Sequence, residues 1–171
     1  MPKLVILRGN SGSGKSTVAK EVRKRMGYGT ALIEQDYIRR TLLREKDQPG
    51  QPNIRLIDMT VRFSLDQGYN VVLEGILPKK HYGEMLAHLI KDHAAVSYIY
   101  YFDIPFEETL QRHKTKPNSH EFGEKEMRQW YLPQDFLDTK NEQVISHTLS
   151  SKEIIDRIAS DIHQGGEQPS R

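Results

Sequence analysis

Gly9-Asn10-Ser11-Gly12-Ser13-Gly14-Lys15-Ser16-Thr17 stands near the start of the chain. The segment satisfies the spacing G-x-x-x-x-G-K-[ST] at every position, between an apolar run at residues 4–7 and a helical pattern that begins at Ser16. Glycines allow consecutive backbone N–H groups to turn toward a phosphate, and the helix that follows directs the positive end of its dipole at the same anion. The sequence therefore predicts a nucleotide phosphate site. A flexible Gly/Ser turn is the alternative, which the flanking strand and helix disfavour.

Two side chains of this loop suit phosphate chemistry. Lys15 is expected to reach the β- and γ-phosphate oxygens, and the Ser16 hydroxyl is placed to ligate Mg²⁺. ATP and Mg²⁺ are the implied cofactors, although the sequence does not choose between ATP and GTP. We expect the nucleotide to contact the whole loop, that is Gly9, Asn10, Ser11, Gly12, Ser13, Gly14, Lys15, Ser16 and Thr17.

Apolar runs alternate with helical spacing along the chain, which predicts a parallel sheet wrapped by crossover helices. Strands are expected at residues 4–7, 30–34, 71–73, 96–102 and 143–146. Helices are expected at residues 16–26, 37–43, 53–67, 79–92, 105–113, 124–131 and 150–162, the last with a Ser150/Glu153 capping box. The predicted fold is α/β, a three-layer sandwich with a five-stranded parallel sheet and helices on both faces.

The composition limits the classes of function. The 171 residues suffice for one domain, expected at residues 1–163, with a flexible tail at 164–171. Lys and Arg number 25 and Asp and Glu 23, a balance that argues against a coat of nucleic acid or an anionic membrane surface. The chain has no cysteine, no apolar run of membrane-spanning length and no pattern of a secretory signal, so we expect a cytoplasmic protein. Nothing in the sequence predicts the oligomeric state.

Polar residues follow two of the predicted strands. Ligands of open α/β sheets bind at the carboxyl ends of the strands, where Asp36 and Glu74 stand. Asp36 is suited to act as a general base, or alternatively as an ordinary helix N-cap. Arg39 and Arg40 lie three and four residues further on and either bind the acceptor or form a solvated helix face. Glu74 contacts the acceptor or the metal, or forms a buried ion pair.

A basic loop at about residues 113–123 separates two late helices. Such a loop can close over the phosphates as a lid, excluding water and placing positive charge on the transferred group. Its charged candidates are Arg112, Lys114, Lys116 and Arg128, and the alternative is an ordinary solvated loop. Aromatic residues can line an acceptor pocket or belong to the core, and the candidates are Tyr37, Tyr82, Trp130 and Tyr131.

Over residues 3–162 the chain resembles the P-loop small-molecule kinases. The resemblance rests on the Gly9–Thr17 loop, the Asp-x-x-Arg of Asp36 to Arg39, and the basic lid. The Asp-x-x-Arg is similar to that of polynucleotide 5′-kinases and adenylylsulfate kinase, and the layout is similar to chloramphenicol phosphotransferase and zeta-toxin sugar kinases. The resemblance implies that Asp36 is the general base and Arg39 binds the acceptor.

The lid also resembles a family feature, in part. Adenylate kinase-like lids carry Arg-x-x-x-Arg, and this chain has Arg112 at the first place and Lys116 at the second. Lysine keeps the charge but lacks the two-pronged guanidinium. The resemblance implies that Arg128 is a second phosphate-binding arginine. The Asp-Gly-Phe-Pro-Arg segment of nucleoside monophosphate kinases is absent.

The sequence therefore predicts a kinase that moves the γ-phosphate of ATP to a hydroxyl of a small molecule such as a nucleoside, a sugar or an antibiotic. Catalytic roles fall to Lys15, Asp36, Arg112 and Arg128, and acceptor binding to Asp36, Arg39, Arg40 and Glu74. Two alternatives stay open, a polynucleotide 5′-hydroxyl kinase and a non-catalytic nucleotide-binding switch.

Overall fold

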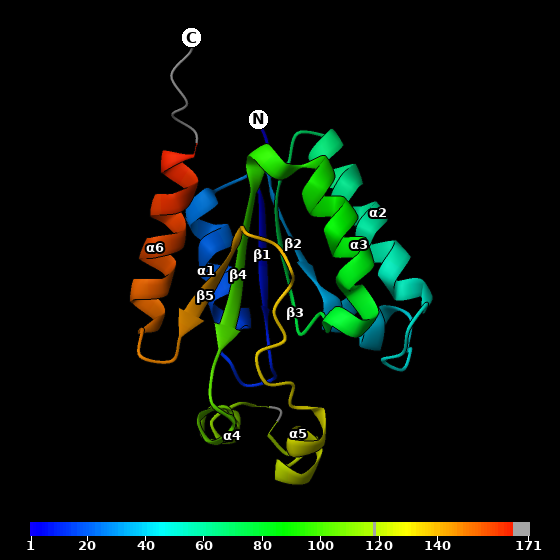
Figure 1. The fold of residues 1–171 in the computed structure, drawn as a ribbon, viewed down its shortest axis with the longest axis vertical. Helices are drawn as coiled ribbons and strands as arrows, with labels where there is room; N and C mark the ends of the chain where they lie inside the picture. The colour runs from blue at the N-terminus through cyan, green and yellow to red at the C-terminus, as the bar shows by residue number, and fades with distance from the viewer. Residues whose placement is uncertain (118, 166–171) are drawn as a thin grey trace.

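The computed structural model describes residues 1–117 and 119–165. Five parallel strands form one sheet in the order β2-β3-β1-β4-β5 (Figure 1). The strands are β1 (Leu4–Gly9), β2 (Thr30–Glu34), β3 (Asn70–Gly75), β4 (Ser97–Asp103) and β5 (Glu142–Ser146). The predicted parallel α/β sheet is confirmed. β1 continues to Gly9, past its predicted end at Leu7, so the strand delivers the chain directly into the Gly9–Thr17 loop.

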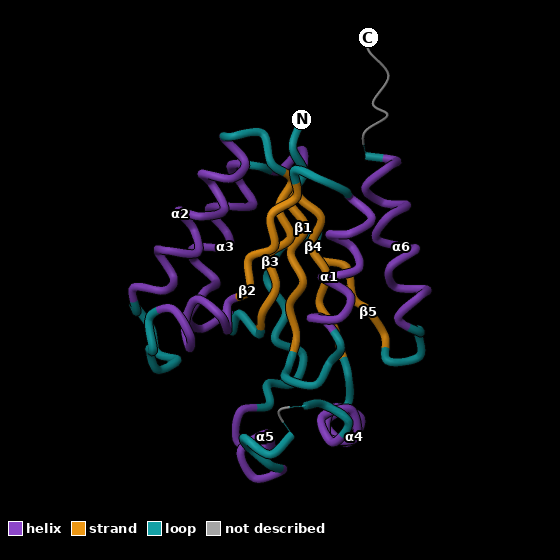
Figure 2. Tube along the Cα trace, turned by 180° about the vertical axis from the view of Figure 1, so that it is seen from behind, coloured by secondary structure: helices purple, strands orange, loops and turns teal. Residues whose placement is uncertain are grey.

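Helices cover both faces of the sheet (Figures 1 and 2). The α-helices are α1 (Lys15–Met26), α2 (Pro52–Asp66), α3 (Lys79–Asp92), α4 (Phe106–Lys114), α5 (Glu124–Trp130) and α6 (Ser151–Gln164). A short π-helix, η1 (Tyr37–Leu42), follows β2, and a single 3₁₀ turn, η2 (Ala94–Val96), precedes β4. α1 and α6 lie on one face, and α2 and α3 on the other, which confirms the three-layer sandwich.

β1 explains why both faces need a cover. Alternate side chains of a strand point to opposite faces: Leu4 and Ile6 pack in the core under α2 and α3, while Val5 and Leu7 pack under α1 and α6. All four are fully buried. The apolar run in the centre of the sheet is therefore used on both sides, as the sequence predicts.

The last helix starts as expected but ends later. The Ser150 hydroxyl accepts a hydrogen bond from the Glu153 N–H, and the Glu153 carboxylate accepts one from the Ser150 N–H, so the capping box is confirmed. Gln164 still belongs to α6, which shortens the expected tail, and residues 166–171 of that tail lie outside the described residues. Within the described ranges, no helix is both long and apolar enough to cross a lipid bilayer.

α4, α5 and the loop between them stand beyond the carboxyl ends of the strands, away from both chain termini (Figure 1). Residues 113–123, expected to form the lid, span the end of α4 and that loop; Asn118 lies outside the described residues. The Gly9–Thr17 loop emerges at the same edge of the sheet. The fold thus brings the loop, the lid segment and the ends of β2 and β3 to one place.

Candidate active site

The Gly9–Thr17 loop is compact and held from within. The Lys15 ammonium donates to the backbone oxygen of Asn10 at 3.1 Å, and the lysine is only 7% exposed. Burial lowers the pKa of Lys15, an effect that the carboxylates of Glu74 and Asp36 oppose. A buried ammonium near the start of a helix is suited to bind an anionic ligand, whose negative charge offsets the cost of burying the ammonium.

Within the described residues, the Ser13 hydroxyl is buried and has no hydrogen-bond partner. Buried polar groups without a partner are rare in proteins, so this one points to a missing ligand. Gly12 and Gly14 adopt left-handed backbone, with φ of 79° and 90°. A Cβ on Gly12 would lie 2.4 Å from the backbone oxygen of Thr109 in α4, so no larger residue fits there. These features fit a phosphate in the loop.

Ser16 and Glu74 meet across the loop. The Ser16 hydroxyl donates a hydrogen bond of 3.0 Å to Oε1 of Glu74, whose side chain is buried at the end of β3. Burial raises the pKa of Glu74, while Lys15 and the Ser16 hydrogen bond act in the opposite direction. Hydroxyl and carboxylate oxygens are ligands that Mg²⁺ prefers, so this pair fits the expected metal. Among the described residues, no three Asp, Glu or His side chains form a metal cluster by themselves.

Asp36 lies at the start of η1. Its side chain makes no capping hydrogen bond, so the structure does not use it as the plain N-cap of the alternative interpretation. Oδ1 of Asp36 instead lies 3.5 Å from Nη2 of Arg39 and 3.7 Å from Nε of Arg40. The segment is a π-helix where the sequence predicted an ordinary helix, and π-helical turns are frequent at functional sites.

The two arginines differ in environment. Arg39 is largely buried: Nη1 donates to the backbone oxygen of Glu45, and Nε has no partner among the described residues. Arg40 is more exposed and places its guanidinium 6.0 Å from the ring centre of Phe122. Arg40 lines the pocket described next and reaches toward the lid segment, whereas Arg39 does not line it, so the predicted contact of Arg39 with the acceptor stays a prediction.

The lid segment covers the loop in this structure. A pocket of about 130 Å³ lies between them, and Asp36 and Glu74 line it together with the loop residues. Lys116 lines the pocket as well. Burial lowers the pKa of Lys116, and repulsion from Lys15 lowers it further. The full lining is Ser11, Gly12, Lys15, Ser16, Asp36, Arg40, Glu74, Gly75, Ile76, Lys116, Phe122 and Trp130.

Aromatic contacts hold this lid together. The His113 ring stacks on Phe122 at 4.4 Å between centres, and Phe122 lies 5.1 Å from Trp130. The sequence left open whether Trp130 lines a pocket or belongs to the core, and here it lines the pocket; Phe122 and Ile76 were not predicted. No spacing signals Phe122, because its place over the pocket depends on how the loop folds back on α4.

Arg112 and Arg128 have different surroundings. Nη1 of Arg112 donates to the backbone oxygen of Ser13 at 2.9 Å, so this arginine joins α4 to the phosphate loop. Arg128 pairs with Glu124, lies 4.3 Å from the ring centre of Phe106, and does not line the pocket. The structure thus brings Arg112 to the predicted site and leaves Arg128 at its outer side, where its predicted phosphate contact stays a prediction.

The remaining aromatic candidates are divided. Tyr82 is fully buried and Tyr37 is 55% exposed, and neither lines the pocket. The Tyr131 hydroxyl donates to the backbone oxygen of Ile104.

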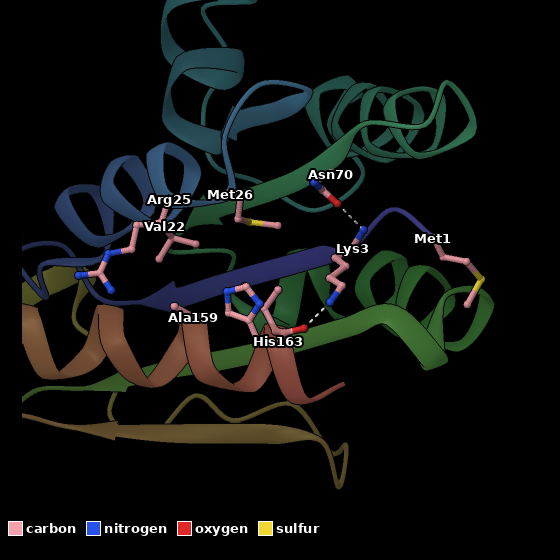
Figure 3. Close-up of a pocket in the computed structure, with 9 residues that line it drawn as sticks. Met1, Lys3, Val22, Arg25, Met26, Asn70, Ala159 and His163 are labelled. Atoms are coloured by element: carbon pink, nitrogen blue, oxygen red, sulfur yellow. Dashed lines mark hydrogen bonds between the residues drawn. The ribbon is translucent and has the colours of Figure 1, made fainter. Parts of the chain in front are cut away.

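Another pocket of about 340 Å³ lies at the amino end of the sheet, where the Lys3 N–H donates to Oδ1 of Asn70 and His163 lies across from them (Figure 3). It contains none of the predicted site residues.

The sheet order, the phosphate loop and the lid define a P-loop kinase fold. The chain belongs to a family described as AAA domain, whose model matches residues 4–132. Similar solved structures include an APS kinase of Mycobacterium tuberculosis in complex with AMPPNP and APS, with 20% identity, a TM-score of 0.69, and coverage of 95% of this chain and 98% of that one. A sugar kinase from Janibacter sp. HTCC2649 has 19% identity, a TM-score of 0.68, and coverage of 95% and 96%.

A gluconokinase from Sinorhizobium meliloti 1021 has 18% identity, a TM-score of 0.59, and coverage of 95% and 97%. Among curated proteins, the chain is 29% identical over 117 residues to the bifunctional enzyme NodQ of Azospirillum brasilense. The match covers 65% of this chain and 18% of that enzyme, so the chain corresponds to a small part of it.

Proposed function

We propose that the protein is an ATP- and Mg²⁺-dependent kinase that transfers the γ-phosphate to an alcohol hydroxyl of a small molecule. The observation that carries the proposal is the single pocket lining shared by Lys15, Ser16 and Asp36. A phosphate-binding lysine, a metal-binding hydroxyl and a carboxylate are the groups that phosphoryl transfer to a hydroxyl requires. Mg²⁺ bound with ATP supplies charge neutralisation on the transferred phosphoryl group.

Each residue has a distinct task. Lys15 stabilises negative charge on the β- and γ-phosphates, and Ser16 holds the metal with Glu74 behind it. Asp36 accepts the proton of the attacking hydroxyl, and its half-exposed carboxylate is open to an acceptor in the pocket. Arg39 and Arg40 both lie near the Asp36 carboxylate and orient the acceptor by holding that carboxylate in place.

The lid has two tasks. Lys116 brings a second cation to the phosphates, and Phe122 with Trp130 keeps water from the site. Exclusion of water matters because a kinase must favour its acceptor over hydrolysis. Arg112 fixes the lid to the loop through its bond to the Ser13 backbone.

The test is a screen of nucleosides, sugars, antibiotics and oligonucleotides for labelled phosphate from [γ-³²P]ATP. We expect transfer to an alcohol group in one of the small-molecule classes. Transfer to the 5′ end of oligonucleotides would favour the polynucleotide kinase instead, with binding that weakens steeply as salt rises. Nucleotide binding without transfer to any acceptor would favour a switch.

A further inference from the structure

Buried hydrogen bonds connect α2 and α3 to the segments that precede and follow η1. Nε2 of Gln35 donates to the Tyr82 hydroxyl at 2.9 Å, and that hydroxyl donates to Oδ1 of Asn53 at 2.7 Å. The backbone N–H and side-chain amide of Asn53 both donate to Oε2 of Glu45, at 3.0 and 2.8 Å. We call these residues, Gln35, Tyr82, Asn53 and Glu45, the Gln35 chain. Its first three members are at most 1% exposed.

The Gln35 chain also reaches the strand that carries the phosphate loop. The Leu77 N–H donates to Oε1 of Gln35 at 2.9 Å, and the Leu77 carbonyl accepts from Nε and Nη2 of Arg8 at 3.2 and 3.0 Å. Arg8 directly precedes Gly9. Leu77 has left-handed backbone, with φ of 44°, a conformation that a leucine keeps only when its surroundings impose it. The bonds on both sides of Leu77 impose it here.

The two ends of the Gln35 chain, Gln35 and Glu45, hold the short polypeptide segment that contains Asp36 and Arg39. Gln35 is the residue before Asp36, and the backbone oxygen of Glu45 accepts from Nη1 of Arg39 at 3.1 Å. Gly75 leaves room for this arrangement, since a Cβ there would lie 2.4 Å from Oε1 of Gln35. The segment with the proposed base and the acceptor arginine is therefore fixed at its start and at its end.

General stability does not explain the arrangement. Apolar side chains of similar volume stabilise a buried site as well as a polar network does, and a network in which every member is bonded specifies one geometry. Burial raises the pKa of Tyr82 to about 12, so its hydroxyl keeps its proton even at a pH at which an exposed tyrosine begins to lose it. The bonds converge on residues 35–45 rather than on the centre of the core.

We propose that the Gln35 chain fixes Asp36 and Arg39 relative to the phosphate loop, and that Tyr82 is a positioning residue for phosphoryl transfer. The inference rests on the proposed function. Tyr82 acts through Gln35 and Asn53 and touches no reacting group. A misplacement of about 1 Å in a catalytic group lowers a rate by about 100-fold, so loss of one bond in the chain is measurable in the rate.

The experiment compares Tyr82→Phe with Tyr100→Phe. Tyr100 is also fully buried, and its hydroxyl donates to Oδ2 of Asp161 at 2.7 Å, in the core on the opposite face of the sheet. Tyr82→Phe removes a hydroxyl with two buried hydrogen bonds, and Tyr100→Phe removes a hydroxyl with one partly buried hydrogen bond, so Tm is measured for both variants and kcat is compared at a temperature at which both are folded. Tyr82→Phe should lower kcat by about 10-fold or more with an unchanged Kd for ATP, whereas Tyr100→Phe should leave kcat unchanged.

Two further measurements complete the test. Glu45→Ala, at the partly exposed end of the chain, removes the acceptor of both Asn53 bonds and should lower kcat in the same direction. Amide hydrogen exchange can be measured without knowing the phosphate acceptor. The backbone amides of residues 36–46 should exchange faster in Tyr82→Phe than in Tyr100→Phe.

Equal kcat values in the two tyrosine variants, or an unchanged kcat in folded Glu45→Ala, would overturn the inference. If the wild-type protein phosphorylates no acceptor, the proposed function fails together with the role of Tyr82 in phosphoryl transfer, and hydrogen exchange then tests only the claim that the Gln35 chain fixes the segment with Asp36 and Arg39. Unchanged exchange of residues 36–46 in Tyr82→Phe would then overturn it, and faster exchange would support it.

Discussion

Ser16 and Glu74 are joined by a 3.0 Å hydrogen bond between the first turn of α1 and the end of β3. The bond places a hydroxyl and a buried carboxylate beside the phosphate loop, with Lys15 close enough to oppose the effect of burial on the Glu74 carboxyl. One strand end and one helix start thus place two oxygen atoms where the proposed function puts Mg²⁺.

Ser16→Ala should weaken Mg²⁺-dependent binding of ATP. Loss of the hydroxyl removes the proposed metal ligand and leaves Glu74 without the donor that it contacts. By analogy with other residues that support metal sites, the affinity for Mg²⁺ with ATP should fall by about 10- to 100-fold. Calorimetric titration at fixed ATP measures this fall. Ser64→Ala, which removes a hydroxyl bonded to the Thr60 backbone on α2, is the control and should bind normally.

Lys116→Ala should slow phosphate transfer more than it weakens ATP binding. The Lys116 side chain lines the pocket, whereas Lys114, on the same lid, is exposed. Loss of one charge-stabilising group typically lowers kcat by about 100-fold or more, and steady-state kinetics with the acceptor found in the screen measures it. Lys114→Ala is the matched control. Equal kcat values for the two variants would contradict the assigned role of Lys116.

The buried hydroxyl of Tyr82 predicts a pH dependence of stability. The pKa of Tyr82 rises from 10.0 to about 12 in the folded protein, chiefly through burial. A raised folded-state pKa means that its contribution to stability is fully present below pH 10 and is lost as the pH rises through about 12. Between these values the unfolded chain has released this proton and the folded protein has kept it.

Urea denaturation between pH 9 and 11.5 tests this prediction. The free energy of unfolding should fall more steeply with pH in the wild-type protein than in Tyr82→Phe, which lacks the hydroxyl. The difference in slope should correspond to the release of up to about one proton on unfolding. Parallel curves for the two proteins would show that the Tyr82 hydroxyl titrates in the folded protein as it does in the unfolded chain.

The sequence predicts the fold well because its signals are local. The Gly9–Thr17 spacing, the alternation of apolar runs and helical patterns, and the Ser150/Glu153 capping box all depend on residues close together in the chain. The order of the strands in the sheet does not depend on such local signals, because neighbouring strands such as β2 and β3 are far apart in the sequence. The π-helical form of residues 37–42 was also missed, since the spacing of apolar residues in so short a segment does not distinguish helix types.

The site was predictable in part for the same reason. Asp36 and Glu74 lie near the carboxyl ends of β2 and β3, and Lys15 and Ser16 begin the helix after the phosphate loop, so the topology brings all four to one pocket. Phe122 and Ile76 enter that pocket through loop geometry that no sequence spacing describes. Arg128 lies over the Phe106 ring of α4, outside the pocket, and the Gln35 chain joins residues from four separate segments of the sequence, so neither arrangement follows from local spacing.

The central claim is that Asp36 serves the acceptor hydroxyl while the phosphate loop holds the nucleotide. The direct measurement is the rate of γ-phosphate transfer in Asp36→Asn beside Asp103→Asn, a control with the same change at the end of β4. We predict that Asp36→Asn binds ATP within about twofold of wild type and transfers phosphate about 100- to 10,000-fold more slowly, whereas Asp103→Asn transfers normally. Transfer at the wild-type rate by Asp36→Asn would contradict the claim.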